Sequence, residues 1–169
     1  DESNEMSRAG DLGHACLAGE IHIDELDDET AKTVAVIKKI EEHTLEDCGY
    51  ENAEQIREKR LWFDIDGVKQ FSGKPDLICL LGKEAFVIDY KTGPLPVEPA
   101  AANMQLRALL VLVDHNFGPF ETIKTGIIQP RNHLNPATFA QYDRKAIMVS
   151  YVQVLDLLED VEKENPPRN

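Results

Sequence analysis

Two strongly apolar segments, residues 75–81 and 85–91, carry charges that a buried strand ordinarily lacks. Their length and composition predict two neighbouring central strands of a sheet, joined by a short turn. Because side chains on a strand alternate between its two faces, Asp89 and Lys91 are expected to point the same way. If the two strands pair, Asp76 reaches the same patch. Burying such charges costs free energy unless they serve a site, so this region constrains both fold and function.

Each of these charged residues has a plain structural explanation when it is taken alone. Asp76 follows Gly-Lys-Pro, a context typical of a turn, and the other two suit an ion pair at a strand end. Taken together, two carboxylates and an ammonium group beside strongly apolar neighbours indicate a functional site instead. Convergence of these groups suits a divalent cation and a substrate that contains phosphate.

The rest of the sequence predicts helices before, between and after further strands. Apolar periodicity and capping residues predict helices over residues 7–20, 28–47, 100–114 and 143–164. Extended patterns predict strands over residues 54–63, 68–71 and 121–129. Asp66-Gly67 is a dipeptide typical of a two-residue hairpin turn between the first two of these strands. This order predicts an α/β domain with a mixed sheet.

A chain of 169 residues with 42% hydrophobic content can bury one sizeable core, so we expect a single domain over residues 1–169. Its polar start without a methionine leads us to expect a truncated N-terminus. No run of about 18 apolar residues occurs, so no membrane span is expected. The three cysteines lack a Cys-x-x-Cys spacing, which indicates reduced thiols in a cytoplasmic protein and argues against zinc or iron–sulfur sites.

The net charge of −13, from 31 acidic and 18 basic residues, constrains the partners of the chain. Proteins that bind nucleic acid without sequence preference are usually basic, so tight backbone binding by this chain alone is not expected. Nucleic acid that is held locally, through a metal ion and a few cations, remains compatible with this composition. The acidic run at residues 24–29 lacks the spacing of a calcium-binding loop and is expected to be a solvated turn.

Pro75-Asp76 and Asp89-Tyr90-Lys91 match the two halves of a known signature. They resemble the PD and (D/E)-x-K elements of the PD-(D/E)XK nuclease superfamily. The stretch 87–93, Val-Ile-Asp-Tyr-Lys-Thr-Gly, has the form typical of its RecB-like exonuclease branch. The resemblance extends in order and spacing over residues 8–130. A short segment before the first motif is typical of phage-encoded members, so we expect a phage origin.

Two helix motifs of the RecB-like branch also have counterparts here. The branch carries an upstream histidine in a Gly-x-x-x-His context, which Gly10 and His14 supply. It carries Gln-x-x-x-Tyr on the helix after the lysine strand, and Gln105 falls there. Leu109 stands where the tyrosine would be, which puts in doubt the DNA contacts that this helix usually makes. The resemblance implies a restriction-endonuclease-like fold, with a mixed central β-sheet flanked by α-helices.

The resemblance further implies a metal-dependent nuclease that hydrolyses phosphodiester bonds in DNA as an exonuclease. One or two Mg²⁺ or Mn²⁺ ions would be held by two carboxylates, a backbone carbonyl and a histidine nitrogen, from Asp76, Asp89, Tyr90 and His14. Lys91 would orient or deprotonate the attacking water, and Gln105 is expected to belong to the same catalytic site. A nitrogen donor favours Mn²⁺ over Mg²⁺.

Several alternatives remain open from the sequence. The same fold could serve as a non-catalytic DNA-binding or scaffolding module, or as a nuclease that needs a protein partner or homo-oligomer. The intact aspartates and lysine favour catalysis, whereas the acidic balance favours a partner that supplies the DNA grip. Exonuclease or endonuclease action, strand polarity, DNA or RNA, and single or double strands are also open. For Glu58 and Arg131 both a surface role and a site role remain open.

Overall fold

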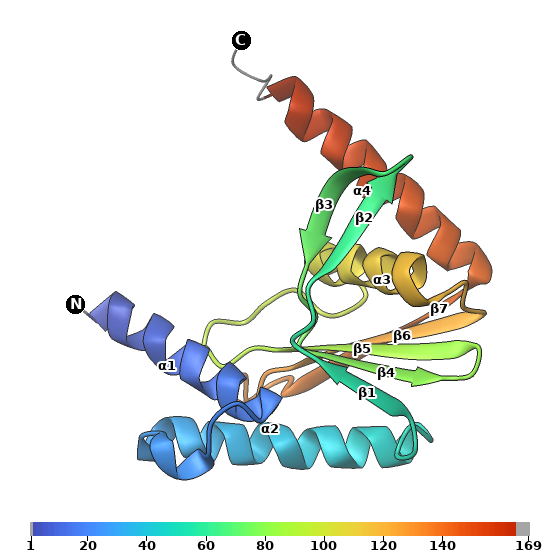
Figure 1. Cartoon of the computed structure of the whole chain (residues 1–169). Coiled ribbons are helices and arrows are strands. Elements are labelled where there is room, and N and C mark those ends of the chain that lie inside the picture. The colour runs from blue at the N-terminus through green and yellow to red at the C-terminus, as the bar shows by residue number, and fades with distance from the viewer. Residues whose placement is uncertain (1, 165–169) are drawn as a thin grey trace.

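A five-stranded mixed sheet forms the centre of the computed structural model, which describes residues 2–164. Figure 1 shows helices on both faces of this sheet and a separate hairpin beside it. The strands of the sheet lie in the order β1 (Glu54–Arg57), β4 (Leu77–Leu81), β5 (Glu84–Tyr90), β6 (Thr122–Ile128) and β7 (Ala137–Asp143). Neighbouring strands are antiparallel except β5 and β6, which are parallel. The mixed α/β architecture that the sequence predicts is therefore confirmed.

The parallel pairing of β5 with β6 determines where the charged end of β5 lies. Parallel neighbours need a crossover connection, which α3 (Met104–Phe117) supplies. The segments that follow both strands therefore leave the sheet at the same edge, and the backbone N–H of Lys91 donates to the carbonyl of Ile128 at 2.9 Å. All of β5 after its first residue is buried, as expected of a central strand that is apolar on both faces.

Two helices cover each face of the sheet (Figure 1). The first face carries α1 (Glu2–Ala18) and α2 (Asp28–Asp47), which are joined by a short 3₁₀ turn over Ile23–Glu25. The carboxylate of Asp27 accepts two backbone N–H groups of the first turn of α2 and so begins that helix. The second face carries α3 and α4 (Arg144–Glu164). Within residues 2–164, no helix combines the length and the apolar character that crossing a membrane requires.

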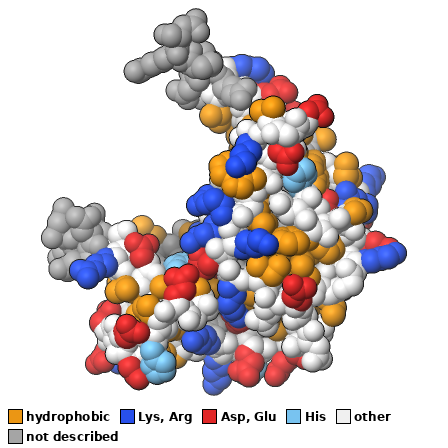
Figure 2. Space-filling view, viewed as in Figure 1, with side chains coloured by type: hydrophobic (Ala, Val, Ile, Leu, Met, Phe, Trp, Pro, Cys, Tyr) orange, Lys and Arg blue, Asp and Glu red, His pale blue; other side chains and the backbone are white. Residues whose placement is uncertain are grey.

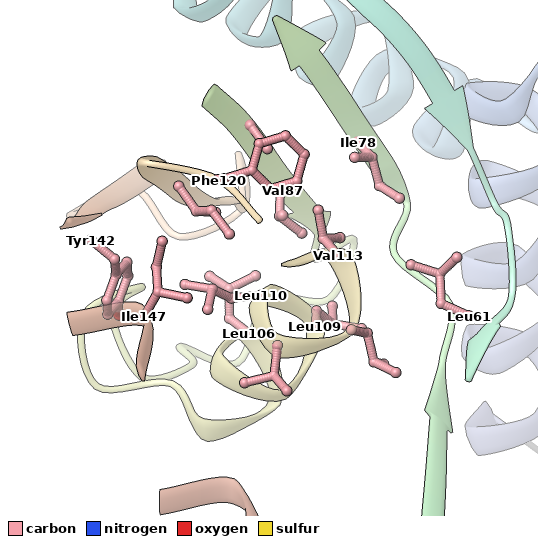
Figure 3. Close-up of a cluster of buried hydrophobic side chains, with 14 of the residues drawn as sticks. Leu61, Ile78, Val87, Leu106, Leu109, Leu110, Val113, Phe120, Tyr142 and Ile147 are labelled. Atoms are coloured by element: carbon pink, nitrogen blue, oxygen red, sulfur yellow. The ribbon is translucent and has the colours of Figure 1, made fainter. Parts of the chain in front are cut away.

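The larger apolar core surrounds α3, between the sheet and α4 (Figure 3). Figure 3 shows Ile78 and Val87 from the sheet and Ile147 from α4 beside this helix. Leu110 of α3 has no exposed surface. A second cluster lies on the other face, where apolar residues of α1 and α2 pack against alternate residues of β5, including Phe86, Ile88 and Tyr90.

The remaining strands, β2 (Leu61–Ile65) and β3 (Val68–Gly73), form an antiparallel hairpin outside the main sheet. Asp66 and Gly67 both have positive φ, at 50° and 80°, as a tight two-residue turn requires. The hairpin predicted at Asp66-Gly67 is thus confirmed. At the other end, a Cβ on Gly73 would lie 2.8 Å from side-chain atoms of α3, so any other residue there would require Leu109 and Leu112 to shift.

Three features differ from the sequence-based expectations. The single strand expected over residues 54–63 is wrong, because Glu58, with φ 51°, separates β1 from β2 and sends them into different sheets. The edge strand β7 was not expected, since its residues are half-exposed and lack a strong apolar pattern. The third predicted helix begins at Met104 rather than at residue 100, because Asn103 caps it by accepting the N–H of Leu106.

Replacing Leu110 with alanine is expected to lower the free energy of unfolding by about 2–5 kcal/mol, because it leaves a cavity in the core. Urea unfolding followed by circular dichroism measures this loss. Leu134→Ala is the matched control, since Leu134 is 90% exposed, and its effect should stay within about 0.5 kcal/mol. Equal losses in the two variants would contradict this placement of α3.

Candidate functional site

A histidine and two carboxylates from three segments converge at the edge where β5 ends. His14 lies on α1, Glu58 directly follows β1, and Asp76 directly precedes β4. Nδ1 of His14 lies 3.0 Å from Oδ1 of Asp76 and 3.7 Å from Oε1 of Glu58. One potential ligand atom from each residue lies within 4.8 Å of the other two, so a single cation could contact all three. The expectation that His14 and Asp76 share a site agrees with this geometry.

Glu58 is the residue of this group whose role the sequence left open. Its side chain is only 12% exposed and forms an ion pair with Lys74. Its backbone N–H donates to the carbonyl of Asp76 at 3.2 Å, and its φ of 51° is uncommon for a residue with a side chain. The β1–β4 register pairs Arg57 with Leu77, which places Glu58 opposite Asp76. This pairing joins segments that are distant in sequence, and knowledge of it would have identified Glu58 as a site residue.

The two halves of the predicted signature, Pro75-Asp76 and Asp89-Tyr90-Lys91, are joined by a hydrogen bond to the backbone. Oδ2 of Asp76 accepts the backbone N–H of Tyr90 at 2.6 Å. Asp89 and Lys91 point away from the side of β5 that carries Tyr90, and Lys91 Nζ lies 2.8 Å from an oxygen of Asp89. Lys91 Nζ also donates to Oε1 of Gln105 at 3.2 Å. We call the five charged residues at this edge the charged cluster: His14, Glu58, Asp76, Asp89 and Lys91.

The electrostatics of the charged cluster show an excess of negative charge. Burial raises the pKa of Asp89, and the charge of Asp76 raises it further, against the opposing effect of Lys91. The pKa of His14 is also raised, chiefly by its hydrogen bond to Asp76, although burial opposes this effect. The His14 ring therefore binds its proton more firmly than a free imidazole does. Both pKa values are raised by neighbouring negative charge, and the same negative charge would stabilise a bound cation.

A buried network lies behind the charged cluster, on the α2 side of β5. The hydroxyl of Tyr90 donates to the carboxylate of Glu41, and Arg57 donates to the same hydroxyl at 3.0 Å. Arg57 also pairs with Glu41, with 2.5 Å between Nη2 and Oε1. Burial and the neighbouring Glu41 charge hold the pKa of Tyr90 well above its ordinary value, so the hydroxyl stays a donor. The network fixes residues that are the chain neighbours of Glu58, Asp89 and Lys91.

Two other residues from the sequence analysis lie outside the charged cluster. Leu109 is 4% exposed and belongs to the core around α3, which explains an apolar residue at the position where the RecB-like motif would have a tyrosine. Arg131 pairs with Glu29 at 2.9 Å across a groove of about 440 Å³ between α1, α2 and residues 92–94. That ion pair is exposed, and the surface role weighed for Arg131 fits this position.

The charged cluster is open to solvent through a second groove, also of about 440 Å³. Residues of α1 and of the segments around β1 and β4 line it: Asp11, His14, Ala15, Glu20, Glu58, Lys74 and Asp76. Figure 2 shows that the molecule is hollowed on this side, between α1 and the hairpin, and that Lys and Arg side chains lie along the hollow. A large polymeric substrate could therefore approach from this side.

Replacing Glu41 with alanine is expected to lower the free energy of unfolding by about 3 kcal/mol, because the buried hydroxyl of Tyr90 and the Arg57 guanidinium lose their partner. This value lies at the low end for a broken buried pair, since Arg57 keeps 25% exposure. Glu42→Ala, at the exposed neighbouring position, should change stability by no more than about 0.5 kcal/mol. Denaturant unfolding of both variants tests the network, and equal stability of the two would refute it.

Comparison with known proteins gives one family and several solved structures, two of which are described here. No curated protein matches the sequence. A solved structure from Eubacterium rectale, described as a "putative exonuclease", is 11% identical with a TM-score of 0.49, and the alignment covers 94% of this chain and 68% of that one. The structure of SSO0001 is 22% identical with a TM-score of 0.35, covering 84% of this chain and 68% of that one.

The family model described as the PD-(D/E)XK nuclease superfamily matches residues 2–164, which is nearly the whole chain. This match confirms the resemblance drawn from Pro75-Asp76 and Asp89-Tyr90-Lys91, while the RecB-like branch and a phage origin stay predictions. The mixed sheet flanked by helices is the restriction-endonuclease-like fold expected of such proteins. The chain is therefore a member of the PD-(D/E)XK nuclease superfamily.

Proposed function

We propose that this nuclease is a metal-dependent deoxyribonuclease that degrades DNA as an exonuclease, with the charged cluster as its catalytic site. The observation that carries the proposal is the convergence of His14, Glu58 and Asp76 beside the Asp89–Lys91 pair. These residues lie on or directly beside α1, β1, β4 and β5, yet they meet at one edge of the sheet, where a groove reaches His14, Glu58 and Asp76. A structural ion pair alone would not require three carboxylates and a histidine at one place.

The chemistry of the donor set fits one or two Mg²⁺ or Mn²⁺ ions. Glu58 and Asp76 would supply hard oxygen ligands, and His14 a nitrogen that favours Mn²⁺. Asp89 is proposed as a further oxygen ligand. Two of the carboxylates, Glu58 and Asp89, pair with the ammonium groups of Lys74 and Lys91, which shows that the site gains from positive charge. The backbone carbonyl of Tyr90 is a further proposed ligand. A bound ion would acidify a water molecule and stabilise charge on the phosphate.

Lys91 is the proposed partner of the attacking water. Its ammonium group is held between the carboxylate of Asp89 and the amide oxygen of Gln105, at 2.8 and 3.2 Å. These two acceptors restrict the position of the Lys91 side chain. The side chain is 26% exposed, so solvent can still reach it. Lys91 can therefore orient a water molecule and screen charge on the phosphate. Gln105 is proposed to act by positioning Lys91.

Exonuclease action is proposed from the counterparts of the RecB-like motifs, His14 and Gln105, since both lie at the charged cluster. A second candidate is a partner-dependent nuclease subunit or a DNA-binding module on the same fold. The net charge of −13 favours it, because a partner would then supply part of the DNA grip. Cleavage by the isolated chain separates the two candidates.

The test is cleavage of end-labelled linear DNA and of covalently closed circular DNA, with Mn²⁺, with Mg²⁺ and with a chelator. We expect metal-dependent loss of the linear DNA alone, with the higher rate in Mn²⁺. Asp89→Asn and Lys91→Ala should each lower the rate by about a hundredfold or more, as loss of a catalytic proton-transfer or charge-stabilising group does. Asp156→Asn and Lys83→Ala, at exposed positions away from the cluster, serve as matched controls.

Each outcome of that assay has a definite meaning. Cutting of the circular DNA would keep the site but make the protein an endonuclease. Equal loss of activity in the Lys83→Ala control would point to contamination or unfolding rather than to the charged cluster. No cleavage under any condition, in a folded protein that binds metal, would replace the proposal with the partner-dependent or DNA-binding candidate.

Metal binding by the charged cluster can be measured without activity. Glu58→Gln is expected to weaken Mn²⁺ binding by at least about tenfold, since even residues that only support a metal ligand contribute that much. Isothermal titration of Mn²⁺ into the metal-free protein gives the affinity. Glu54→Gln is the matched control, because Glu54 is an exposed residue of β1, the strand that Glu58 directly follows. Unchanged affinity in Glu58→Gln would remove Glu58 from the ligand set.

A further inference from the structure

The β2–β3 hairpin and the residues that flank it, 59–74, together carry a small excess of positive charge, whereas the chain as a whole is acidic. Residues 59–74 contain four Lys or Arg residues and two acidic residues, in a protein of net charge −13. All four cations, Lys59, Arg60, Lys69 and Lys74, are exposed. A local excess of positive charge on an acidic protein marks a surface where an anion could bind.

The outer side of the hairpin also carries the only tryptophan of the chain, Trp62. The inner side packs on α3 through Leu61 and Phe63, whereas Trp62 points outward with 40% exposure. Nζ of Lys69, from the facing strand, lies 4.3 Å from the centre of the Trp62 ring. Tryptophan is on average a largely buried residue, so an exposed ring beside a cation suits a binding role.

The outer side of the hairpin leads directly to the charged cluster. Lys74 lies two residues before Asp76 and forms an ion pair with Glu58. Arg60, two residues after Glu58, donates to the hydroxyl of Ser72 at 3.0 Å. The hairpin rises from the region where β1 and β4 begin to pair (Figure 1), and Lys and Arg side chains follow the hollowed side there (Figure 2). Trp62 lies about 7 Å further along β2 than Arg60.

We propose that this surface binds a segment of single-stranded DNA and presents it to the charged cluster. It consists of Arg60, Trp62, Lys69 and Lys74, and we call it the hairpin surface. Cations suit the phosphates of a strand, and an exposed aromatic ring suits a base that stacks on it. In a duplex the base faces are covered by their neighbours, so Trp62 could reach only unpaired or terminal bases. The inference rests on the proposed function and adds the form of the DNA that the site receives.

The single tryptophan makes the hairpin surface directly observable. We expect a short oligothymidylate to quench the fluorescence of Trp62 in the presence of a chelator, which prevents cleavage. Covalently closed circular duplex DNA, which has no terminal bases, should bind more weakly and leave the emission nearly unchanged. Equal affinity for the duplex, or binding of the single strand without quenching, would overturn the inference.

Substitutions then locate the contact, with affinity measured by the fluorescence anisotropy of a labelled oligothymidylate. Trp62→Ala should weaken binding by about five- to hundredfold, the range that loss of one stacked base gives. Trp62→Phe keeps an aromatic ring and should lose less, which guards against misfolding of the alanine variant. Lys69→Ala should weaken binding and reduce the slope of log affinity against log salt by about one. Lys83→Ala, on the distant β4–β5 turn, is the matched control and should change neither quantity.

The outcomes for the hairpin surface and for the catalytic site are separable. Asp89→Asn should abolish cleavage but retain quenching of Trp62, because it leaves the hairpin intact. Quenching by a parent protein that cleaves nothing would keep the hairpin surface and refute the catalytic proposal. Metal-dependent cleavage with unchanged affinity in both Trp62→Ala and Lys69→Ala would keep the catalytic proposal and refute the hairpin surface.

Discussion

Tyr90 is fixed through both its backbone and its side chain, and the charged cluster depends on this. Its N–H group holds one oxygen of Asp76 at 2.6 Å, while its hydroxyl is held by Glu41 and Arg57 on the opposite side of the sheet. A strand alternates its side chains, so the same constraint directs the residues on either side of Tyr90 toward the cluster. Because Arg57 directly precedes Glu58, the network also positions the acid at the end of β1. Charged side chains at this edge are thus aligned by a buried framework, which limits the reorganisation needed for binding a cation.

The same framework explains how a sheet can carry so much charge at one end. Buried carboxylates are costly unless they are paired or hydrogen-bonded, and each buried acid here has such partners. Asp76 accepts from His14 and Tyr90, Asp89 pairs with Lys91, and the carboxylate of Glu41 is bound by Arg57. Some of these partners are themselves cationic, so a metal ion would compete with them for the carboxylates. The raised pKa of Asp89 shows that burial is not fully compensated by Lys91, which is the condition under which a divalent ion gains most.

Local sequence patterns predicted the elements whose structure is set by nearby residues. The hairpin turn at Asp66-Gly67, the paired strands with their charged ends, and most helix bounds belong to this group. The break between β1 and β2 was missed because no glycine or proline marks it, and the positive φ of Glu58 arises from its pairing with Asp76, which is distant in sequence. For the same reason, the place of Glu58 in the charged cluster could be predicted only with knowledge of the β1–β4 register. The family was predicted from the signature, whereas the exposed position of Trp62 depends on the packing of the hairpin on α3.

The acidic composition conflicts with the proposed DNA substrate only while charge is counted over the whole chain. At physiological ionic strength, exposed charges more than about 8 Å apart are largely screened from each other. The acidic run at residues 24–29 lies at the connection between α1 and α2, away from the β2–β3 hairpin (Figure 1), so it does not cancel the cations of the hairpin surface. In the proposed mode of binding, this acidic run would repel DNA from the side of the molecule that carries the α1–α2 connection. Acidic surroundings would then add to selectivity, and affinity would come from a few cations, one aromatic ring and a bound metal ion.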